Sequence, residues 1–373
     1  MTETAIAEMA PEKLMHSIIQ RIATGPELSK DISQEEANYG LQYILDGKID
    51  QVQAAIFFIA LRMKRETWDE NRGVLDALLA KTKTVTAPVD EVFAIVDPYN
   101  GYNRTLPPAP FLPALLAECG VPTVTEGVET LAPKYGVTHK QILRAAGVPV
   151  DLTPDEAAAR LGDSATGWTY VDQSQFCPAV YNLIDLRTRM VKRQVLTTVE
   201  VLTGPIRGKK KTHFATGFVH KPYPPVYAML ARHSGFDSAI LMRGIEGGVI
   251  PSLRQPGRAV YYHEMAEEHE VEFNPADFGV EQENRAVPFP EGIEQINSLD
   301  TVEANKANND AMVKAAVEAG MSALSGEAGP THDALMYSAG IYLWHLKKFD
   351  SIKDACAAVR EVLASGTTVK RIK

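Results

Sequence analysis

The chain has 373 residues, a formal net charge of −9 and 45% apolar residues, which is typical of a soluble globular protein long enough for two domains. The longest uninterrupted apolar run, 54–61, is too short to span a bilayer, and the acidic N-terminus lacks the basic start of a secretory signal. We therefore expect a cytoplasmic protein with no membrane partner. The negative charge also argues against a surface that is coated all over by nucleic acid.

The first ninety residues are predicted to be helical. Ser33 and Glu36 fit a capping box, and Val52, Ile56 and Ile59 fall on one face of the helix that carries the apolar run. Cys119, Cys177 and Cys356 lie far apart in the sequence, so we expect three reduced thiols and neither disulfides nor a zinc site.

From about residue 90 the pattern changes to short apolar strands that alternate with helices. Strands are predicted at 91–96, 121–125, 214–220, 238–243 and 259–263, and helices at 110–118, 301–324 and 333–364. Two further capping boxes start at Thr138 and Thr153. Such alternation predicts the α/β class, with a mostly parallel central sheet covered on both faces and a small helical domain before it.

The loop at 97–105 is the most informative segment, because a loop between a strand and a helix lies at a ligand site in a βαβ unit. A loop that cradles diphosphate usually has several glycines, so that backbone N–H groups can converge on the anion. This loop has only Gly101, and it carries Asp97, whose carboxylate would repel phosphate. The position predicts a ligand site, and the residues predict a changed ligand.

The same loop offers other binding groups. Tyr99, Asn100, Tyr102, Asn103 and Arg104 supply stacking faces, amide hydrogen bonds and a cation, which suit a base or a small aromatic ligand. The alternative is a turn packed by its own tyrosines, since Asn-Gly favours turns.

Several motifs resemble the anthranilate phosphoribosyltransferase family. Residues 60–67, Ala-Leu-Arg-Met-Lys-Arg-Glu-Thr, resemble the Ala-Leu-Arg-x-Lys-Gly-Glu-Thr of its N-terminal helical domain, and 274–279 and 329–333 agree with its C-terminal third. The middle resembles the YbiB-type paralogues, most specifically at 241–247, Leu-Met-Arg-Gly-Ile-Glu-Gly.

This resemblance implies a fold and an assembly. The family fold is a small helical domain, often the dimer interface, beside a large α/β domain with the active site in the cleft between them. For this chain it implies a helical domain of 1–88 plus about 172–198, an α/β domain of 89–171 plus 199–373, and a homodimer.

The resemblance also implies that the donor site has changed. The transferases hold phosphoribosyl diphosphate with a glycine-rich loop, an Asn-x-Ser-Thr helix start and a Lys-His-x-Asn-Arg strand end. The stretches that correspond here are 97–101, 105–108 and 125–129, and the last of these contains Glu126 but no lysine, histidine or arginine. The family's magnesium-binding Asp-Glu pair falls near Val249 and Ile250, and aliphatic side chains cannot ligate the ion. We therefore expect no cofactor, a lost Mg-diphosphate site and no transfer from that donor.

The resemblance also implies that some of the family's cleft residues are kept in this sequence. Arg187 and Arg193 match two family arginines, the first of which meets the aromatic acid substrate, and an arginine can hold a carboxylate or a phosphate in bidentate geometry. The alternative for Arg187 is a surface salt bridge. The complete set of predicted cleft residues is Asp97, Tyr99, Asn100, Gly101, Tyr102, Asn103, Arg104, Thr105, Glu126, Arg187, Arg193, His220, Arg243 and Glu246.

Two weaker patterns remain. The basic run of Arg207, Lys209, Lys210 and Lys211 could hold a nucleic-acid backbone, or it could be a solvated loop. The segment His263-Glu-Met-Ala-Glu267 looks like a zinc-protease helix, but Glu267 occupies the place of the second histidine, so we predict no metal site there.

Two classes of function stay open. The first is a binding protein that takes nucleic acid or a small aromatic or anionic ligand in the inherited cleft. The second is an enzyme, of the glycosyltransferase or phosphoribosyltransferase type, that acts on a different small molecule there. The sequence identifies no catalytic acid, base or nucleophile, and on that ground we favour binding.

Overall fold

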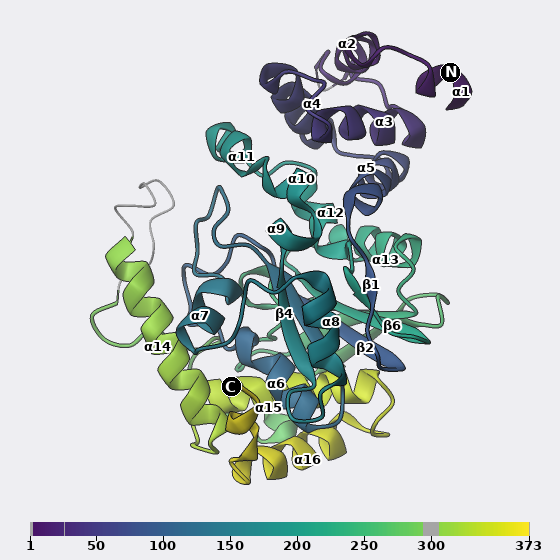
Figure 1. Cartoon of the computed structure of the whole chain (residues 1–373). Coiled ribbons are helices and arrows are strands. Elements are labelled where there is room, and N and C mark those ends of the chain that lie inside the picture. The colour runs from purple at the N-terminus through teal and green to yellow at the C-terminus, as the bar shows by residue number, and fades with distance from the viewer. Residues whose placement is uncertain (1–2, 26, 294–305, 373) are drawn as a thin grey trace.

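The computed structural model describes residues 3–25, 27–293 and 306–372, which form a helical lobe on top of a larger α/β body (Figure 1). Ser33 and Thr67 each start a lobe helix with a complete capping box, of which the sequence analysis predicted the first. The helices of the lobe are α1 Glu3–Ala7, α2 Pro11–Ile22, α3 Gln34–Leu45, α4 Gln51–Lys64 and α5 Trp68–Lys81.

The body is built on a seven-stranded sheet with the order β4-β3-β2-β6-β7-β8-β9. Neighbouring strands from β4 to β7 are parallel, and β8 and β9 are antiparallel additions at one edge. The predicted mostly parallel sheet is therefore confirmed. The strands are β2 Glu91–Val96, β3 Thr123–Gly127, β4 Trp168–Asp172, β6 Lys211–Phe218, β7 Ser238–Arg243, β8 Gly257–His263 and β9 His269–Phe273, with β1 Val85–Thr86 and β5 Ile206–Arg207 as a separate parallel pair.

Helices cover both faces of this sheet. Val92, Ala94 and Val96 of β2 belong to one buried cluster, and Phe93 and Ile95 belong to the other, as expected for alternating side chains. The remaining helices are α6 Leu112–Glu118, α7 His139–Ala145, α8 Pro154–Gly162, α9 Gln173–Phe176, α10 Pro178–Tyr181, α11 Ile184–Met190, α12 Leu196–Val199, α13 Tyr223–His233, α14 Lys306–Leu324, α15 Pro330–His345 and α16 Ile352–Ala364, with short 3-10 turns η1 Ala109–Phe111, η2 Glu200–Leu202, η3 Ile245–Gly247, η4 Pro275–Phe278 and η5 Thr367–Ile372.

The structure corrects two details of the predicted elements. The helical periodicity predicted at 333–364 is divided between two helices, since the chain adopts a left-handed conformation at Lys347 and Ser351 caps a new helix. The helix expected at 301–324 begins at Lys306 within the described residues, and 301–305 lie outside them.

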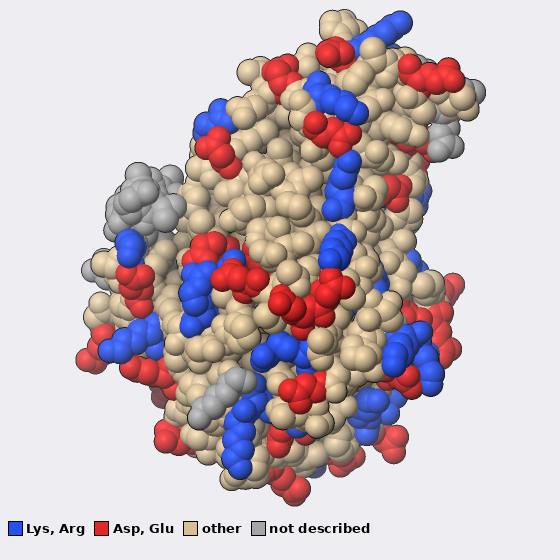
Figure 2. Space-filling view, in the orientation of Figure 1, with Lys and Arg blue, Asp and Glu red and all other residues tan. Residues whose placement is uncertain are grey.

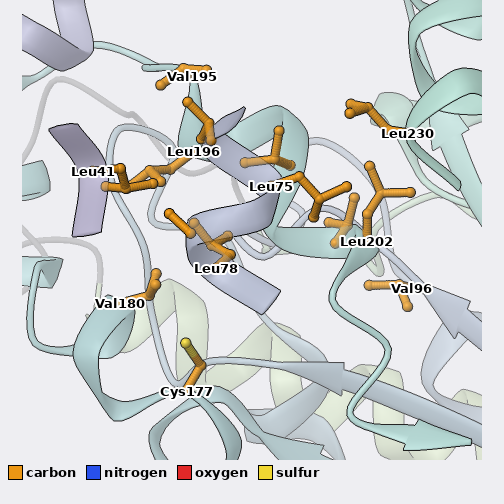
Figure 3. Packing of buried hydrophobic residues seen from close by; sticks show 14 of the residues in the cluster. Leu41, Leu75, Leu78, Val96, Cys177, Val180, Val195, Leu196, Leu202 and Leu230 are labelled. Carbon is orange, nitrogen blue, oxygen red and sulfur yellow. The ribbon is translucent and has the colours of Figure 1, made fainter. Parts of the chain in front are cut away.

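A return segment, α9 to α12, joins the body to the helical lobe. Figure 3 shows Leu75 and Leu78 of α5 close to Val195 and Leu196 of this segment, and all four side chains lie in one buried cluster. Arg189 of α11 donates a hydrogen bond of 2.6 Å to the Oε1 atom of Gln51. The domain of 1–88 plus about 172–198 stays a prediction, because the same buried cluster also contains residues of the body such as Val96 and Leu230. Within the described residues, no helix has the length and hydropathy needed to cross a membrane.

Candidate functional site

The loop that follows β2 is clamped at the carboxyl edge of the sheet. Gly101 has a φ of 70°, and a Cβ atom there would lie 2.5 Å from the carbonyl oxygen of Val137, so only glycine fits. The neighbouring Tyr102 forms an isolated antiparallel bridge with Val137. Asn100 is buried in the same turn. The loop is therefore packed against 136–137, and both interpretations of the sequence, a ligand site and a turn packed by its own tyrosines, stay predictions.

Asp97 is the centre of a buried network. One oxygen, Oδ2, accepts a hydrogen bond of 2.6 Å from the Tyr102 hydroxyl and lies 2.8 Å from Nε2 of His139. The other oxygen, Oδ1, accepts a bond of 2.8 Å from the backbone N–H of Val249. The second ring nitrogen of His139 lies 3.1 Å from the hydroxyl of Thr125. Both oxygens of Asp97 are thus bonded within the protein.

A second buried network links the sheet to the return segment. The Tyr99 hydroxyl donates to Oε1 of Glu126 over 2.7 Å and lies 3.4 Å from the carbonyl oxygen of Glu200. Burial raises the pKa of Glu126 to about 8, although Tyr99 and Arg207 oppose this shift. Glu126 therefore keeps its proton at neutral pH, and the side chain is a neutral acid at the end of β3.

Arg187 is held by a carboxylate of the same chain. Its two terminal nitrogens donate to the two carboxylate oxygens of Glu200, each over 2.7 Å, and neither side chain is more than 1% exposed. This is the bidentate geometry that arginine can also offer to a ligand carboxylate. Arg187 thus forms a salt bridge, as one interpretation of the sequence predicted, but this salt bridge is buried and does not lie on the surface.

Glu246 binds the other end of the loop after β2. Its carboxylate accepts hydrogen bonds from the backbone N–H of Arg104 (2.9 Å), the backbone N–H of Asn103 (3.3 Å) and the hydroxyl of Thr105 (2.9 Å). The ammonium group of Lys134 lies 2.5 Å from Oε2 of Glu246. No motif in the sequence indicated the roles of Lys134 and His139, because each meets its partner only through the fold.

Cations and aromatic rings lie around Arg193, where the family resemblance places the mouth of a cleft. Burial lowers the pKa of Arg193, and the positive charges of Arg62 and Arg104 also lower it. The guanidinium of Arg62 lies 5.6 Å from the ring centre of Tyr223, whose ring is 6.0 Å from that of Tyr227. We call these residues, Arg62, Arg104, Arg193, Tyr223 and Tyr227, the mouth cluster.

His220 and Arg243 end the neighbouring strands at the same edge. His220 follows β6 and its ring lies 6.4 Å from that of Tyr223, and Arg243 is the exposed last residue of β7. Both therefore lie at the carboxyl ends of the strands, where the sequence analysis predicted them.

The lysines of the basic run lie at the amino-terminal ends of the strands, whereas the loop after β2 lies at their carboxyl ends. Lys211 begins β6, whereas the cleft lies beyond the end of that strand. Lys210 pairs with Asp90 at 2.7 Å, Lys209 donates to a backbone carbonyl, and the guanidinium of Arg207 bonds to the carbonyl oxygens of Gly204 and Ser234. Figure 2 shows lysine and arginine interspersed with aspartate and glutamate among the described residues of the visible face. Lys209, Lys210 and Lys211 therefore lie away from the loop after β2, whereas the charge of Arg207 acts on Glu126, and the role of the run in nucleic-acid binding stays a prediction.

The position expected for magnesium ligands is apolar. Val249 and Ile250 are buried, and the backbone of Val249 bonds to Asp97 through its N–H and to the Tyr342 hydroxyl through its carbonyl oxygen. Among the described residues, no group of three or more histidine, cysteine, aspartate or glutamate side chains could hold a metal ion. The residues at this position do not fit a magnesium ion.

Comparison with known families gives two matches that together span most of the chain. The helical bundle domain of a glycosyl transferase family matches residues 16–82, and the α/β domain of that family matches residues 111–369. An "Uncharacterized protein" of Aquifex aeolicus is 25% identical over 333 residues, covering 89% of this chain and 93% of the relative. The anthranilate phosphoribosyltransferase of Rhodopseudomonas palustris (strain HaA2) is 24% identical over 357 residues, covering 96% of each chain.

Solved structures agree with this fold. The anthranilate phosphoribosyltransferase of Thermus thermophilus superposes with a TM-score of 0.72 at 18% identity, covering 96% of this chain and 97% of the other. The enzyme from Saccharomyces cerevisiae in complex with PRPP and Mg gives a TM-score of 0.71 at 14% identity, covering 97% and 96%.

Proposed function

This chain belongs to the glycosyl transferase family with a helical bundle and an α/β domain, as an anthranilate phosphoribosyltransferase-like member, and we propose that it binds a ligand in its cleft without transferring a phosphoribosyl group. The ligand that we propose is a small molecule with an anionic group and an aromatic ring. No magnesium or other cofactor takes part in this proposal.

The observation that carries the proposal is the closed network around Asp97. A diphosphate at this loop would meet the carboxylate of Asp97, and like charges repel strongly where water is excluded. The Tyr102 hydroxyl and the Val249 N–H, which could otherwise donate to a phosphate, already donate to that carboxylate. A donor complex with PRPP and Mg, of the kind described for the yeast enzyme, therefore lacks its binding groups here.

The pair between Arg187 and Glu200 supports the same proposal from the acceptor side. A substrate carboxylate could reach Arg187 only by displacing Glu200. Breaking a buried ion pair by removing one partner costs about 3–5 kcal/mol, because the other charge stays buried and unpaired. An aromatic acid such as anthranilate would have to overcome that cost, and we expect it not to bind at this arginine.

The mouth cluster supports the choice of ligand. Its arginines carry more positive charge than the nearby Glu66, which pairs with Arg62, can neutralise. Its tyrosines offer ring faces beside those charges, and aromatic rings stack on such faces. A nucleic acid is the other binding candidate, but the lysines of the basic run that suggested it lie at the amino-terminal ends of the strands.

Two titrations test this function. With phosphoribosyl diphosphate and magnesium chloride we expect no heat of binding, and micromolar magnesium-dependent binding would refute the loss of the donor site. With adenosine monophosphate, a probe that has both a phosphate and a ring, we expect saturable binding that weakens by about tenfold in Arg193→Ala, since a charge-assisted bond is lost.

The matched control for the second titration is Arg189→Ala. Arg189 lies on the preceding helix and pairs with Asp185 at the surface, so its removal should leave the affinity unchanged. If the monophosphate does not bind but a labelled single-stranded oligonucleotide does, the nucleic-acid candidate replaces the small ligand.

The second candidate function is an enzyme of the glycosyltransferase or phosphoribosyltransferase type acting on a different small molecule. The neutral acid Glu126 favours it, because an acid with a pKa near the working pH is suited to proton transfer. A pH profile of turnover with an inflection near 8 that disappears in Glu126→Gln would support this candidate.

The helical lobe supports a homodimer. Val52 and Met63 on α4 are 69% and 76% exposed, which is unusual for large apolar side chains on one helix. A groove of about 320 Å³ beside them is lined by apolar residues that include Ile22, Ile56 and Ile59. A second copy that covers this face would remove the exposed apolar area from water.

A further inference from the structure

We propose that His213, His263 and His345 form a switch that holds the end of α15 against the sheet and opens in acid. His345 is the last residue of α15, His263 is the last residue of β8, and His213 lies near the start of β6. The rings of His263 and His345 stack with their centres 4.7 Å apart and 16° between their planes. We call these three residues the histidine switch. It lies at the amino-terminal end of β6, so it does not depend on which ligand the cleft takes.

Hydrogen bonds connect the three rings through Ser238, the first residue of β7. The Ser238 hydroxyl lies 2.8 Å from Nδ1 of His213 and 3.1 Å from Nε2 of His345. The Nε2 N–H of His263 donates to the carbonyl oxygen of His345 over 2.8 Å. The other ring nitrogen of His345, Nδ1, is buried and has no hydrogen-bond partner among the described residues. A protonated His345 would therefore bury an N–H group that has no acceptor.

The surrounding charges also oppose a proton on His345. Burial lowers the pKa of His345 well below its usual value, and His263, His213 and Lys347 lower it further. Burial lowers the pKa of His263 and of His213 as well, although a carboxylate beside each of them opposes the shift. The charged and titratable groups that face the histidine switch are Glu91 from β2, Lys211 from β6, Asp237 before β7, Glu264 after β8, His269 from β9, and Lys347 and Lys348 after α15.

Acid therefore favours an open form in which the rings reach water. An exposed histidine takes up a proton as the pH falls below 6.5, whereas the closed form rejects that proton. The closed form keeps its full stability above this pH and loses it as the pH falls further, because the open form then binds more protons. At about one unit below 6.5, each ring that stays neutral in the closed form raises the equilibrium constant for opening about tenfold.

Both segments that meet at the stacked rings end in strained turns. Glu264 and Met265, directly after β8, have φ values of 52° and 58°, and Lys347, shortly after α15, has a φ of 57°. A side chain with a Cβ atom adopts this left-handed region at a cost. The first turn leads to β9, the edge strand of the sheet. Such ends open locally at a lower free energy than the core of a sheet, so they are suited to release by acid.

The histidine switch is connected to the loop after β2 through α15. Tyr342 lies about one turn before His345, and its hydroxyl donates to the carbonyl oxygen of Val249. The N–H of Val249 donates in turn to Asp97 over 2.8 Å. A displaced end of α15 therefore weakens the contact that holds Asp97, and acid loosens the loop at the other end of the strands.

Hydrogen exchange followed by mass spectrometry at pH 7.5 and pH 5.5, corrected for the intrinsic exchange rate, tests the switch. In the wild-type protein we expect the protection of 257–273, 330–345 and 97–105 to fall at least about tenfold at pH 5.5, while α3 in the lobe keeps its protection. His345→Phe keeps a ring in the stack but takes up no proton, and His263→Gln keeps an N–H donor for the carbonyl oxygen of His345. Each variant should reduce the loss of protection by about tenfold, since one titrating ring is removed.

The matched control is His16→Gln, at an exposed histidine of α2, which should lose protection as the wild-type protein does. The proposal is overturned if protection in the wild-type protein is equal at the two pH values, or if both variants lose as much protection as the wild-type protein. It is also overturned if α3 loses protection to the same extent, because that result reports global unfolding. Unchanged protection of 97–105 would overturn the connection to that loop. If His345→Phe does not fold, His263→Gln still decides the question.

Discussion

Replacing Glu126 by glutamine should stabilise the protein, and the gain should grow as the pH rises. Burial raises the pKa of Glu126 from 4.5 to about 8. Between these two values the folded state holds a proton that the unfolded state releases, so stability falls as the pH rises through this window. Glutamine keeps the oxygen that accepts from Tyr99 but cannot ionise, and it removes this dependence.

The size of the effect follows from the same pKa shift. At pH 7 the unfolded carboxyl group lies 2.5 pH units above its pKa of 4.5. At about 1.36 kcal/mol for each unit, keeping the proton in the folded state costs about 3 kcal/mol. The cost vanishes near pH 4.5 and levels off above pH 8, where the folded side chain also ionises. We therefore expect Glu126→Gln to unfold with a free energy about 3 kcal/mol higher than wild type at pH 7, and with an unchanged value near pH 4.5.

The assay is urea unfolding followed by tryptophan fluorescence at pH 4.5, 6, 7 and 8.5. Glu281→Gln, at an exposed carboxylate, is the control and should track the wild-type protein at every pH. A difference between Glu126→Gln and wild type that stays constant across this range would refute the reasoning, because a constant difference reports packing and not titration.

Three further predictions concern the ion pair, the assembly and the basic run. Glu200→Gln should lower the free energy of unfolding by about 3–5 kcal/mol, because it leaves Arg187 buried without its partner; Asp185→Asn, at an exposed pair, should change it by less than about 1 kcal/mol. Met63→Asp should convert the proposed homodimer into a monomer, and a wild-type protein with a monomeric mass in light scattering at micromolar concentration would exclude that dimer. If nucleic acid binds through 209–211, changing these lysines to glutamate should abolish salt-sensitive binding in fluorescence anisotropy, and an unchanged affinity would assign the binding elsewhere.

Apolar runs and capping boxes in the sequence predicted the strands and helices that contain them. The strands β2 and β7 have the predicted bounds and contain the apolar runs 92–96 and 239–242, and the capping boxes at Ser33, Thr138 and Thr153 start helices as expected. The sequence analysis missed β4 and β9. In β4 the apolar run is broken by Thr169 and ends at Asp172, and β9 is an edge strand with three exposed polar residues of five, so neither shows a continuous apolar pattern.

The sequence could predict the position of the site, but it could not predict which residues form hydrogen bonds and ion pairs with one another. The order of strand, loop and helix predicted a ligand site after β2, which stays a prediction, and the structure places Asp97 and Tyr99 in buried hydrogen-bond networks there. Thr105 and Glu246, however, are separated by 141 residues, and the distance between Arg187 and Glu200 depends on how the return segment folds back. No spacing rule connects such residues, because their contacts are set by the tertiary structure.

The carboxylates of this cleft show how a site can change its ligand while the fold is kept. A buried guanidinium or a set of converging N–H donors without a partner costs more than one that is paired, so inherited donors persist most easily when the chain itself supplies an anion. Glu200 has that role for Arg187, and Glu246 has it for the loop at 103–105. The two anions differ in how firmly they are held. Glu200 is bound by two parallel bonds on a packed segment, whereas Glu246 sits on a strained turn next to a glycine. Glu200 should therefore be harder for a ligand anion to displace than Glu246.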